Sequence, residues 1–144
     1  MLFELDNDFE RVYFFLKRMS KEFNPPLSDR VCIESYSHKL TDFGNNLFAS
    51  IEGVDVAGAS YYERAGVAFL SSFCVCAEYR REGIASGLMD DLINRLIDKR
   101  IYCISLEVNK KAYQAISFYE TKGFMISGVN DAEYYAMKLC INDS

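Results

Sequence analysis

Several features that define other classes of protein are scarce or absent in this sequence. It contains only 2 Pro, 8 Gly and 1 His, and no Trp. So little Pro and Gly excludes collagen-like and low-complexity disordered chains. The 5 Cys are an odd number without a CxxC pair, so neither a disulfide framework nor a Cys/His zinc site is indicated. We predict reduced, mostly buried thiols and no metal site.

Long hydrophobic runs are also missing. The longest apolar-rich stretch, Gly66 to Ala77, contains Ser71 and Ser72 and is shorter than the roughly 18–20 residues that cross a bilayer. The N-terminal MLFELDNDFE is acidic where a secretion signal needs a basic segment. The net charge of −5 argues against binding to nucleic-acid phosphates or to anionic membranes. The sequence therefore predicts a cytoplasmic protein with no nucleic-acid partner and no membrane partner.

The composition is that of an ordinary folded domain. Of the 144 residues, 50% are hydrophobic, 15% aromatic and 26% charged. A chain of this length buries roughly 68–70% of its unfolded surface around one core and is too short for two. We predict a single domain over residues 1–144.

The hydrophobic pattern changes period along the chain. Residues 2–6 alternate as in a strand, Asp8 is placed to cap an amphipathic helix that ends before Pro25, and Ser28 or Asp29 starts a second short helix. The 24–45 segment is the least regular. The remaining expected elements are strands at 46–53, 54–63, 66–76, 101–108, 124–129 and 134–140, with helices from 83 and over 111–122. The turns fall at Gly53, Gly66, Gly123 and Asn130-Asp131. The order βααβββαβαββ indicates an α/β fold with a mixed sheet.

One turn has the chemistry of an anion site. In VCAEYRREGIA, residues 75–85, a glycine turn joins a strand to a long amphipathic helix. The first amides of a helix lack internal partners and carry a partial positive charge, so they attract an anion such as a pyrophosphate. Gly83 and Ala85 leave the backbone accessible, and Arg80 or Arg81 adds a charge-assisted contact. The alternative is that Gly83 and Gly87 only permit close packing.

A second motif follows about 20 residues later. ISLEVN at 104–109 precedes AYQAISFYETKGF at 112–124. Together the two segments resemble the acyl-CoA-binding core of the GNAT N-acetyltransferase family, with its V-x-x-x-[YF]-[RQ]-x-x-G-x-[GA], L-x-V-N, A-x-x-[FL]-Y and G-F motifs. The resemblance extends over about residues 46–140 and implies the GNAT type of mixed central sheet, with helices on both faces. It implies transfer of an acetyl or short acyl group from acyl-CoA to a primary amine in one ternary complex.

The resemblance also assigns roles to residues. Tyr119 occupies the position of the tyrosine that protonates the departing thiolate, and Glu107 that of a general base in some relatives. The pantetheine arm is expected along residues 73–75 and the pyrophosphate on the amides of residues 81–86. The cofactor-binding residues implied in this way are Phe73, Cys74, Val75, Arg80, Arg81, Glu82, Gly83, Ile84, Ala85, Ser86, Asn109 and Phe118. Lys110 and Lys111 either meet the 3′-phosphate or form a solvated face.

Other readings of single residues stay open at this stage. Tyr119 could be a core aromatic, and Glu107 could owe its place to an edge position in the sheet. Cys74 and Cys76 share a strand face and are expected to be packing residues, the alternative being an acyl-accepting nucleophile. His38 is expected on the surface. Where relatives commonly have an asparagine that binds the cofactor arm, this chain has Ala112, and Asn109 nearby could cap the following helix.

The acceptor is expected to be a small-molecule or peptide amine, bound among residues 24–40, Tyr61, Tyr62 and the 129–134 turn. A CoA-binding sensor or interaction module without turnover is the alternative, motivated by Ala112. A third reading is a nucleotide-binding domain of another fold. Small single-sheet domains often cover an exposed edge by pairing, so the sequence also leaves a homodimer open.

Overall fold

The computed structural model describes residues 1–144 except 24, 81 and 142–144. Its elements follow the predicted order of strands and helices. The strands are β1 (Leu2–Leu5), β2 (Asn45–Ile51), β3 (Val54–Arg64), β4 (Val67–Val75), β5 (Cys103–Asn109), β6 (Met125–Asp131) and β7 (Tyr134–Cys140). The α-helices are α1 (Phe9–Met19), α2 (Ile33–Phe43), α3 (Ile84–Asp98) and α4 (Tyr113–Thr121).

All these strands form one mixed sheet of order β1-β2-β3-β4-β5-β7-β6. Neighbouring strands are antiparallel except β4 and β5, which are parallel because α3 connects them. The hairpins β2–β3 and β3–β4 turn at Glu52-Gly53 and Ala65-Gly66, all with positive φ. That pattern is typical of two-residue hairpin turns that match the twist of the strands.

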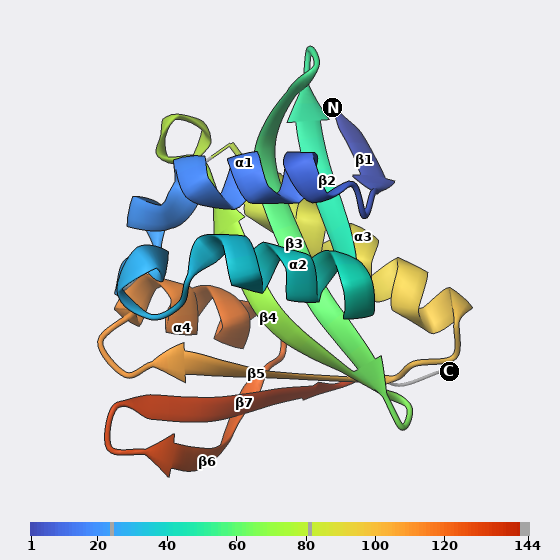
Figure 1. Ribbon diagram of the computed structural model, residues 1–144. Coiled ribbons are helices and arrows are strands. Elements are labelled where there is room, and N and C mark those ends of the chain that lie inside the picture. Colours follow the sequence, from blue (N-terminus) through green and yellow to red (C-terminus); the bar gives the residue numbers. More distant parts are fainter. Residues whose placement is uncertain (24, 81, 142–144) are drawn as a thin grey trace.

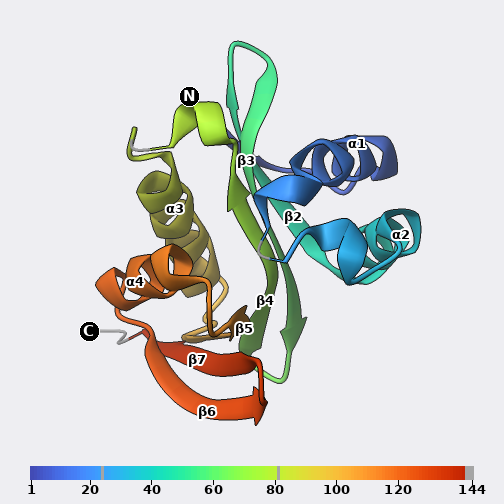
Figure 2. The ribbon, with the colours of Figure 1, turned by 90° about the vertical axis from the view of Figure 1, so that its left-hand side faces the viewer.

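Helices cover both faces of the sheet, as predicted. In Figure 2, α1 and α2 lie on one side of the sheet, and α3 and α4 lie on the other. The larger core cluster packs one face of α3, including Leu88, Leu92 and Leu96, against the sheet. A smaller cluster beneath α1 and α2 contains Leu16, Leu40 and Cys74 among others. The helical period read from the sequence therefore identifies the buried stripe of each long helix.

The sheet opens in its middle. Strands β4 and β5 pair only over Val67–Leu70 and Cys103–Leu106, and beyond that point their ends diverge (Figure 1). On the other side of β4 the register with β3 shifts at Ser71, an extra residue that forms a β-bulge. A bulge bends a strand and increases its twist, so it contributes to turning β4 away from β5.

Three expectations about local structure were wrong. The 24–45 segment is more regular than predicted, because α2 occupies Ile33–Phe43 and only a short 3₁₀ helix forms at Leu27–Asp29. The last hairpin does not turn at Asn130-Asp131: β6 continues to Asp131, whose Oδ1 accepts the amides of Glu133 and Tyr134. The helix expected over 111–122 begins at Tyr113.

Within the described residues, none of the helices is long and apolar enough to span a membrane.

Candidate active site

A cavity of about 730 Å³ lies where β4 and β5 separate. It is lined by the second half of β4, the first turn of α3, the end of β5 and the inner face of α4. The predicted site residues that line it are Phe73, Cys74, Val75, Arg80, Gly83, Ile84, Ala85, Ser86, Glu107, Asn109, Phe118 and Tyr119. Glu82 is exposed and does not line it, and Arg81 lies outside the described residues. The two motifs of the sequence, at residues 75–85 and 104–124, thus line one cavity.

The N-terminus of α3 forms one end of the cavity. Gly83 precedes the helix in a left-handed conformation, φ +76°, and makes no side-chain cap. The first intrahelical bond runs from the Gly87 amide to the Gly83 carbonyl. In the described part of the chain, no side chain accepts a hydrogen bond from the amides of residues 84–86. These amides are therefore available to an anion.

Glycine is needed at position 83 for its backbone angle. A Cβ there would meet no protein atom within 4 Å, so packing within the described chain does not require glycine at this position. A non-glycine residue would be strained at this φ. At Gly87 a Cβ would lie 3.3 Å from the Phe3 ring, so that glycine serves packing.

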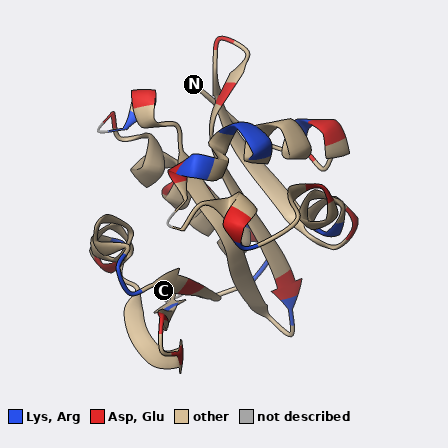
Figure 3. Cartoon of the chain, turned by 60° about the vertical axis from the view of Figure 1, so that its left-hand side comes forward, with Lys and Arg blue, Asp and Glu red and all other residues tan. Residues whose placement is uncertain are grey.

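Arg80 is held across the cavity. Its Nη2 lies 2.8 Å from Oε2 of Glu22, which follows α1 and also lines the cavity. The Arg80 side chain is 47% exposed, and a guanidinium has more N–H donors than one carboxylate contact uses. The ion pair connects the α1 side of the molecule to the turn before α3. In Figure 3, charges of both signs are spread over helices and loops, and the strands carry fewer.

Tyr119 lies on α4 with its ring among aromatic side chains. The centroids of Phe73 and Phe124 lie 6.2 and 5.5 Å from that of Tyr119. The residue is only 9% exposed and lines the cavity. Burial, with a smaller contribution from Cys74, raises the pKa of the Tyr119 phenol well above its usual range. The Tyr119 phenol is therefore protonated and neutral at physiological pH, and its ring also packs as a core aromatic.

Glu107 is exposed on the face of β5 that points away from the α3–α4 core. Its Oε1 accepts a hydrogen bond of 2.6 Å from Nδ2 of Asn130. Asn130 belongs to an irregular stretch of β6, where the register with β7 shifts between Val129 and Asp131. Asn130 was expected in the 129–134 turn of the acceptor region, but its contact with Glu107 was not predicted, because the residue lies in a bulged strand and not in a turn. The Asn130-Asp131 pair in the sequence indicates an interruption of regular strand structure, but it does not tell a turn from a register shift.

Asn109 does not cap α4. Its Oδ1 accepts the Lys111 amide at 2.9 Å, which closes a local turn before the helix. The N-cap position of α4 is Ala112, without a side-chain bond, and Ala112 lines the cavity. Lys111 also lines the cavity, whereas the Lys110 ammonium lies 5.2 Å from the centroid of the Tyr135 ring.

The cysteines and the histidine have ordinary positions near the site. Cys74 is 8% exposed, and burial raises the pKa of its thiol far above the usual range, so it is not a thiolate nucleophile. Cys76 is half-buried against the same cluster. Both pack as expected. His38 is exposed and stacks on Phe9, with 3.9 Å between ring centroids.

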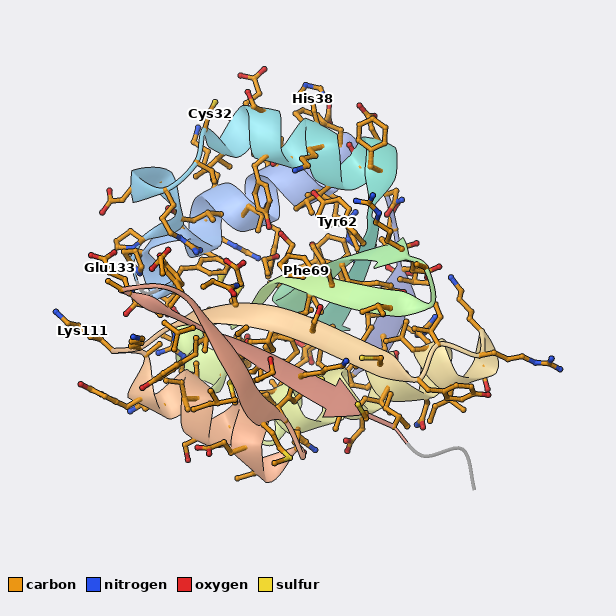
Figure 4. The ribbon with its side chains drawn as sticks, turned by 90° about the horizontal axis from the view of Figure 1, so that it is seen from below. Cys32, His38, Tyr62, Phe69, Lys111 and Glu133 are labelled. Atoms are coloured by element: carbon orange, nitrogen blue, oxygen red, sulfur yellow. The ribbon has the colours of Figure 1, made fainter. Side chains whose placement is uncertain are left out.

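Only part of the region expected to bind the acceptor lies at the cavity. Tyr61 is fully buried in the core beside α3, so it cannot contact an acceptor. Tyr62 points to the other face of the sheet, and Figure 4 shows it near Phe69 beneath α2. Glu133 and Lys111 lie together at the far end of the wing formed by β5, β7 and β6. Arg30 and Tyr134 line the cavity from the two segments that were predicted.

A family model described as the Acetyltransferase (GNAT) family matches residues 4–124. This chain belongs to the GNAT family. The match begins earlier than the resemblance recognised from residue 46 and ends before the last hairpin. Members of the family are acyl-CoA N-acyltransferases.

Solved structures of GNAT proteins share the fold of this GNAT chain. PaiA N-acetyltransferase from Thermoplasma acidophilum, in complex with coenzyme A, is 19% identical with a TM-score of 0.77, covering 97% of this chain and 99% of its own. The ribosomal-protein-S18-alanine N-acetyltransferase from Escherichia coli is 20% identical with a TM-score of 0.77, and the match covers 99% of this chain and 96% of that protein's chain. A GNAT acetyltransferase from Elizabethkingia anophelis with acetyl-CoA bound is 13% identical with a TM-score of 0.66, covering 74% and 82%. No curated protein matches the chain.

Proposed function

We propose that this chain is a cytoplasmic N-acetyltransferase that moves an acetyl or short acyl group from acyl-CoA to a primary amine by direct attack in a ternary complex. The observation that carries the proposal is the cavity between the separated β4 and β5. It contains an anion-binding helix N-terminus and a neutral, buried tyrosine. Coenzyme A bound to two of the structural relatives adds support for this ligand.

The pantetheine arm is proposed to bind along β4. From Ser72 to Val75 the strand has a partner in β3 but none on the β5 side, because the parallel pairing stops at Leu70. Backbone amides and carbonyls on that edge need partners, and an extended amide-containing arm supplies them. The diphosphate then lies on the amides that begin α3, with Arg80 and Lys111 as neighbouring cations.

The chemistry follows from the groups at the opening. Glu107 accepts a proton from the ammonium form of the acceptor, directly or through water, and the amine attacks the thioester carbonyl. A β4 amide near Val75 stabilises the oxyanion. Tyr119 gives its phenolic proton to the departing thiolate, which suits a phenol kept neutral by burial. The attacking nitrogen then loses its second proton to solvent, the Tyr119 phenolate regains a proton from solvent, and Glu107 releases the proton it accepted, so the protons balance without a covalent enzyme intermediate.

The acceptor is proposed to enter on the side of α2 and the β6–β7 hairpin. Glu22, Arg30 and Tyr134 line the cavity on that side. A small-molecule amine and a peptide N-terminus both suit this opening. Incubation with acetyl-CoA and a panel of amines, with release of free thiol as the readout, tests the proposal. Protein that binds coenzyme A and releases no thiol with any acceptor would contradict it.

The second candidate function is a CoA-binding sensor without turnover. Ala112 favours it, because it supplies no side-chain hydrogen bond to the cofactor arm and Asn109 is engaged with Lys111. An acyl-CoA-dependent rise in melting temperature without thiol release would select this reading over catalysis.

A further inference from the structure

Two cysteines face each other across β5 and β7, away from the residues of the cavity. Cys103 and Cys140 are directly opposite in the antiparallel register. The next position along, Ile141, donates its amide to the Tyr102 carbonyl at 2.7 Å. Hydrogen-bonded and non-hydrogen-bonded pairs alternate along an antiparallel ladder, so Cys103 and Cys140 form a non-hydrogen-bonded pair. Such pairs have Cα atoms about 4.5 Å apart, within the range that a disulfide spans.

The two thiols also differ in access. Cys140 is exposed and Cys103 is half-buried, contrary to the expectation that most of the cysteines are buried. Burial is the main cause that raises the pKa of the Cys103 thiol, and a hydrogen bond with Cys140 adds to it. Lys138, on the same strand as Cys140, acts in the opposite direction. The thiols are thus close enough to interact, with a cation beside them and one sulfur open to solvent.

We propose that Cys103 and Cys140 are a modification site, where they form a reversible cross-strand disulfide by exchange with a small-molecule disulfide. The exposed Cys140 thiolate attacks the small disulfide, forms a mixed disulfide and releases one small thiolate. Cys103, as thiolate, then attacks the Cys140 sulfur and releases the second small thiolate. The two cysteines are oxidised and the small disulfide is reduced, and the two protons that the cysteines lose are taken up, through solvent, by the two released thiolates to give two thiols.

The other cysteines provide an internal comparison. Cys32 is exposed, and a hydrogen bond from Ser35 lowers the pKa of its thiol. None of the other four cysteines, all of which are described, faces Cys32 across a strand pair. Cys32 is therefore expected to keep a mixed disulfide, because no neighbouring thiol resolves it. Cys74 is expected to remain unreacted because it is buried.

The experiment uses the full chain with Cys32→Ser, incubated in native conditions with glutathione disulfide. We expect the loss of two thiols with no added glutathione, and a mapped Cys103–Cys140 cross-linked peptide. With Cys103→Ser added, Cys140 should instead retain a glutathione adduct. The proposal would be overturned if Cys140 retained the glutathione adduct to the same extent with Cys103 present as with Cys103→Ser. It would also be overturned if the two thiols stayed unreacted.

A second measurement does not depend on mapping. The cross-link closes a long loop that contains α4 and β6, so oxidation should raise the melting temperature by about 5–10 °C. The rise should disappear on reduction. Cys140→Ser treated in the same way should show none, and a rise of equal size in that variant would contradict the cross-link. Thiol release with amines is not part of either readout, so failure here leaves the proposed function unaffected.

Discussion

The two sides of the cavity are built in different ways. The turn side, residues 75–86, is one continuous stretch in which a strand, a glycine turn and a helix start follow each other. The opposite side, where we propose that the acceptor binds, is formed by side chains from four separate parts of the chain: Glu22, Arg30, Glu107, and Asn130 with Tyr134. An anion site made of backbone needs only local order, whereas a side-chain pocket needs the whole fold. Substitutions on each side should therefore affect different kinetic constants.

The largest effect is expected where the two sides meet, at Tyr119. Tyr119→Phe keeps the aromatic packing but removes the proton donor, so kcat should fall by about 10²–10⁴. Affinity for coenzyme A, measured by calorimetry, should be unchanged. Tyr13→Phe on α1 is a control and should keep the wild-type rate.

The pH dependence gives a second view of the same group. Burial raises the pKa of Tyr119, so the neutral, donating form persists to higher pH than in an ordinary tyrosine. The rate should therefore show no alkaline decline near pH 10 that depends on Tyr119. If the wild-type rate declined with a midpoint at or below about pH 10, and Tyr119→Phe showed no such decline, the phenol would have an ordinary pKa. That result would contradict the raised pKa of Tyr119.

The next effect is expected on the acceptor side, at Asn130. Loss of its hydrogen bond to Glu107 frees the carboxylate, so Asn130→Ala should lower kcat by about 10-fold, with the KM for acyl-CoA unchanged. Glu107→Gln should cost about 10²-fold or more. Because Asn130 acts through Glu107, adding Asn130→Ala to Glu107→Gln should cost nothing further. Additive losses in this cycle would mean that Asn130 acts independently.

These two sides also explain what the sequence could and could not predict. The order of elements, both motifs and the buried faces of α1 and α3 follow from short-range periodicity and from turn residues such as Gly83 and Gly123. The contact of Asn130 with Glu107 was not predicted, because the register shift in β6 that presents Asn130 depends on pairing with β7. Tyr61 and Tyr62 were both placed in the acceptor region, but adjacent residues of a strand point to opposite faces, and which of the two faces the α3 core depends on how β3 packs in the whole fold.

A smaller effect is expected on the turn side, at Gly83. Alanine at φ +76° costs about 1–2 kcal/mol, which the chain can relieve by opening the first turn of α3. Affinity for coenzyme A should then fall by about 10-fold, with kcat at saturation nearly unchanged. Gly66→Ala is the matched control, because it has φ +81° and equal open space but lies in the β3–β4 hairpin. If Gly66→Ala weakened binding as much, the effect would be one of general stability.

The smallest effect is expected at Tyr61. Its hydroxyl is buried and has no hydrogen-bond partner among the described residues, so Tyr61→Phe should change the free energy of unfolding by no more than about 1 kcal/mol, toward greater stability, and leave every KM unchanged. Burial raises its pKa to about 12, so the folded chain retains this proton after the unfolded chain has lost it. The contribution to stability is complete below the ordinary tyrosine value of about 10 and declines as the pH rises from there toward 12. Denaturant unfolding from pH 9 to 11 should thus show a shallower decline in Tyr61→Phe than in the wild type. An increased acceptor KM in Tyr61→Phe would instead place this residue in the acceptor pocket.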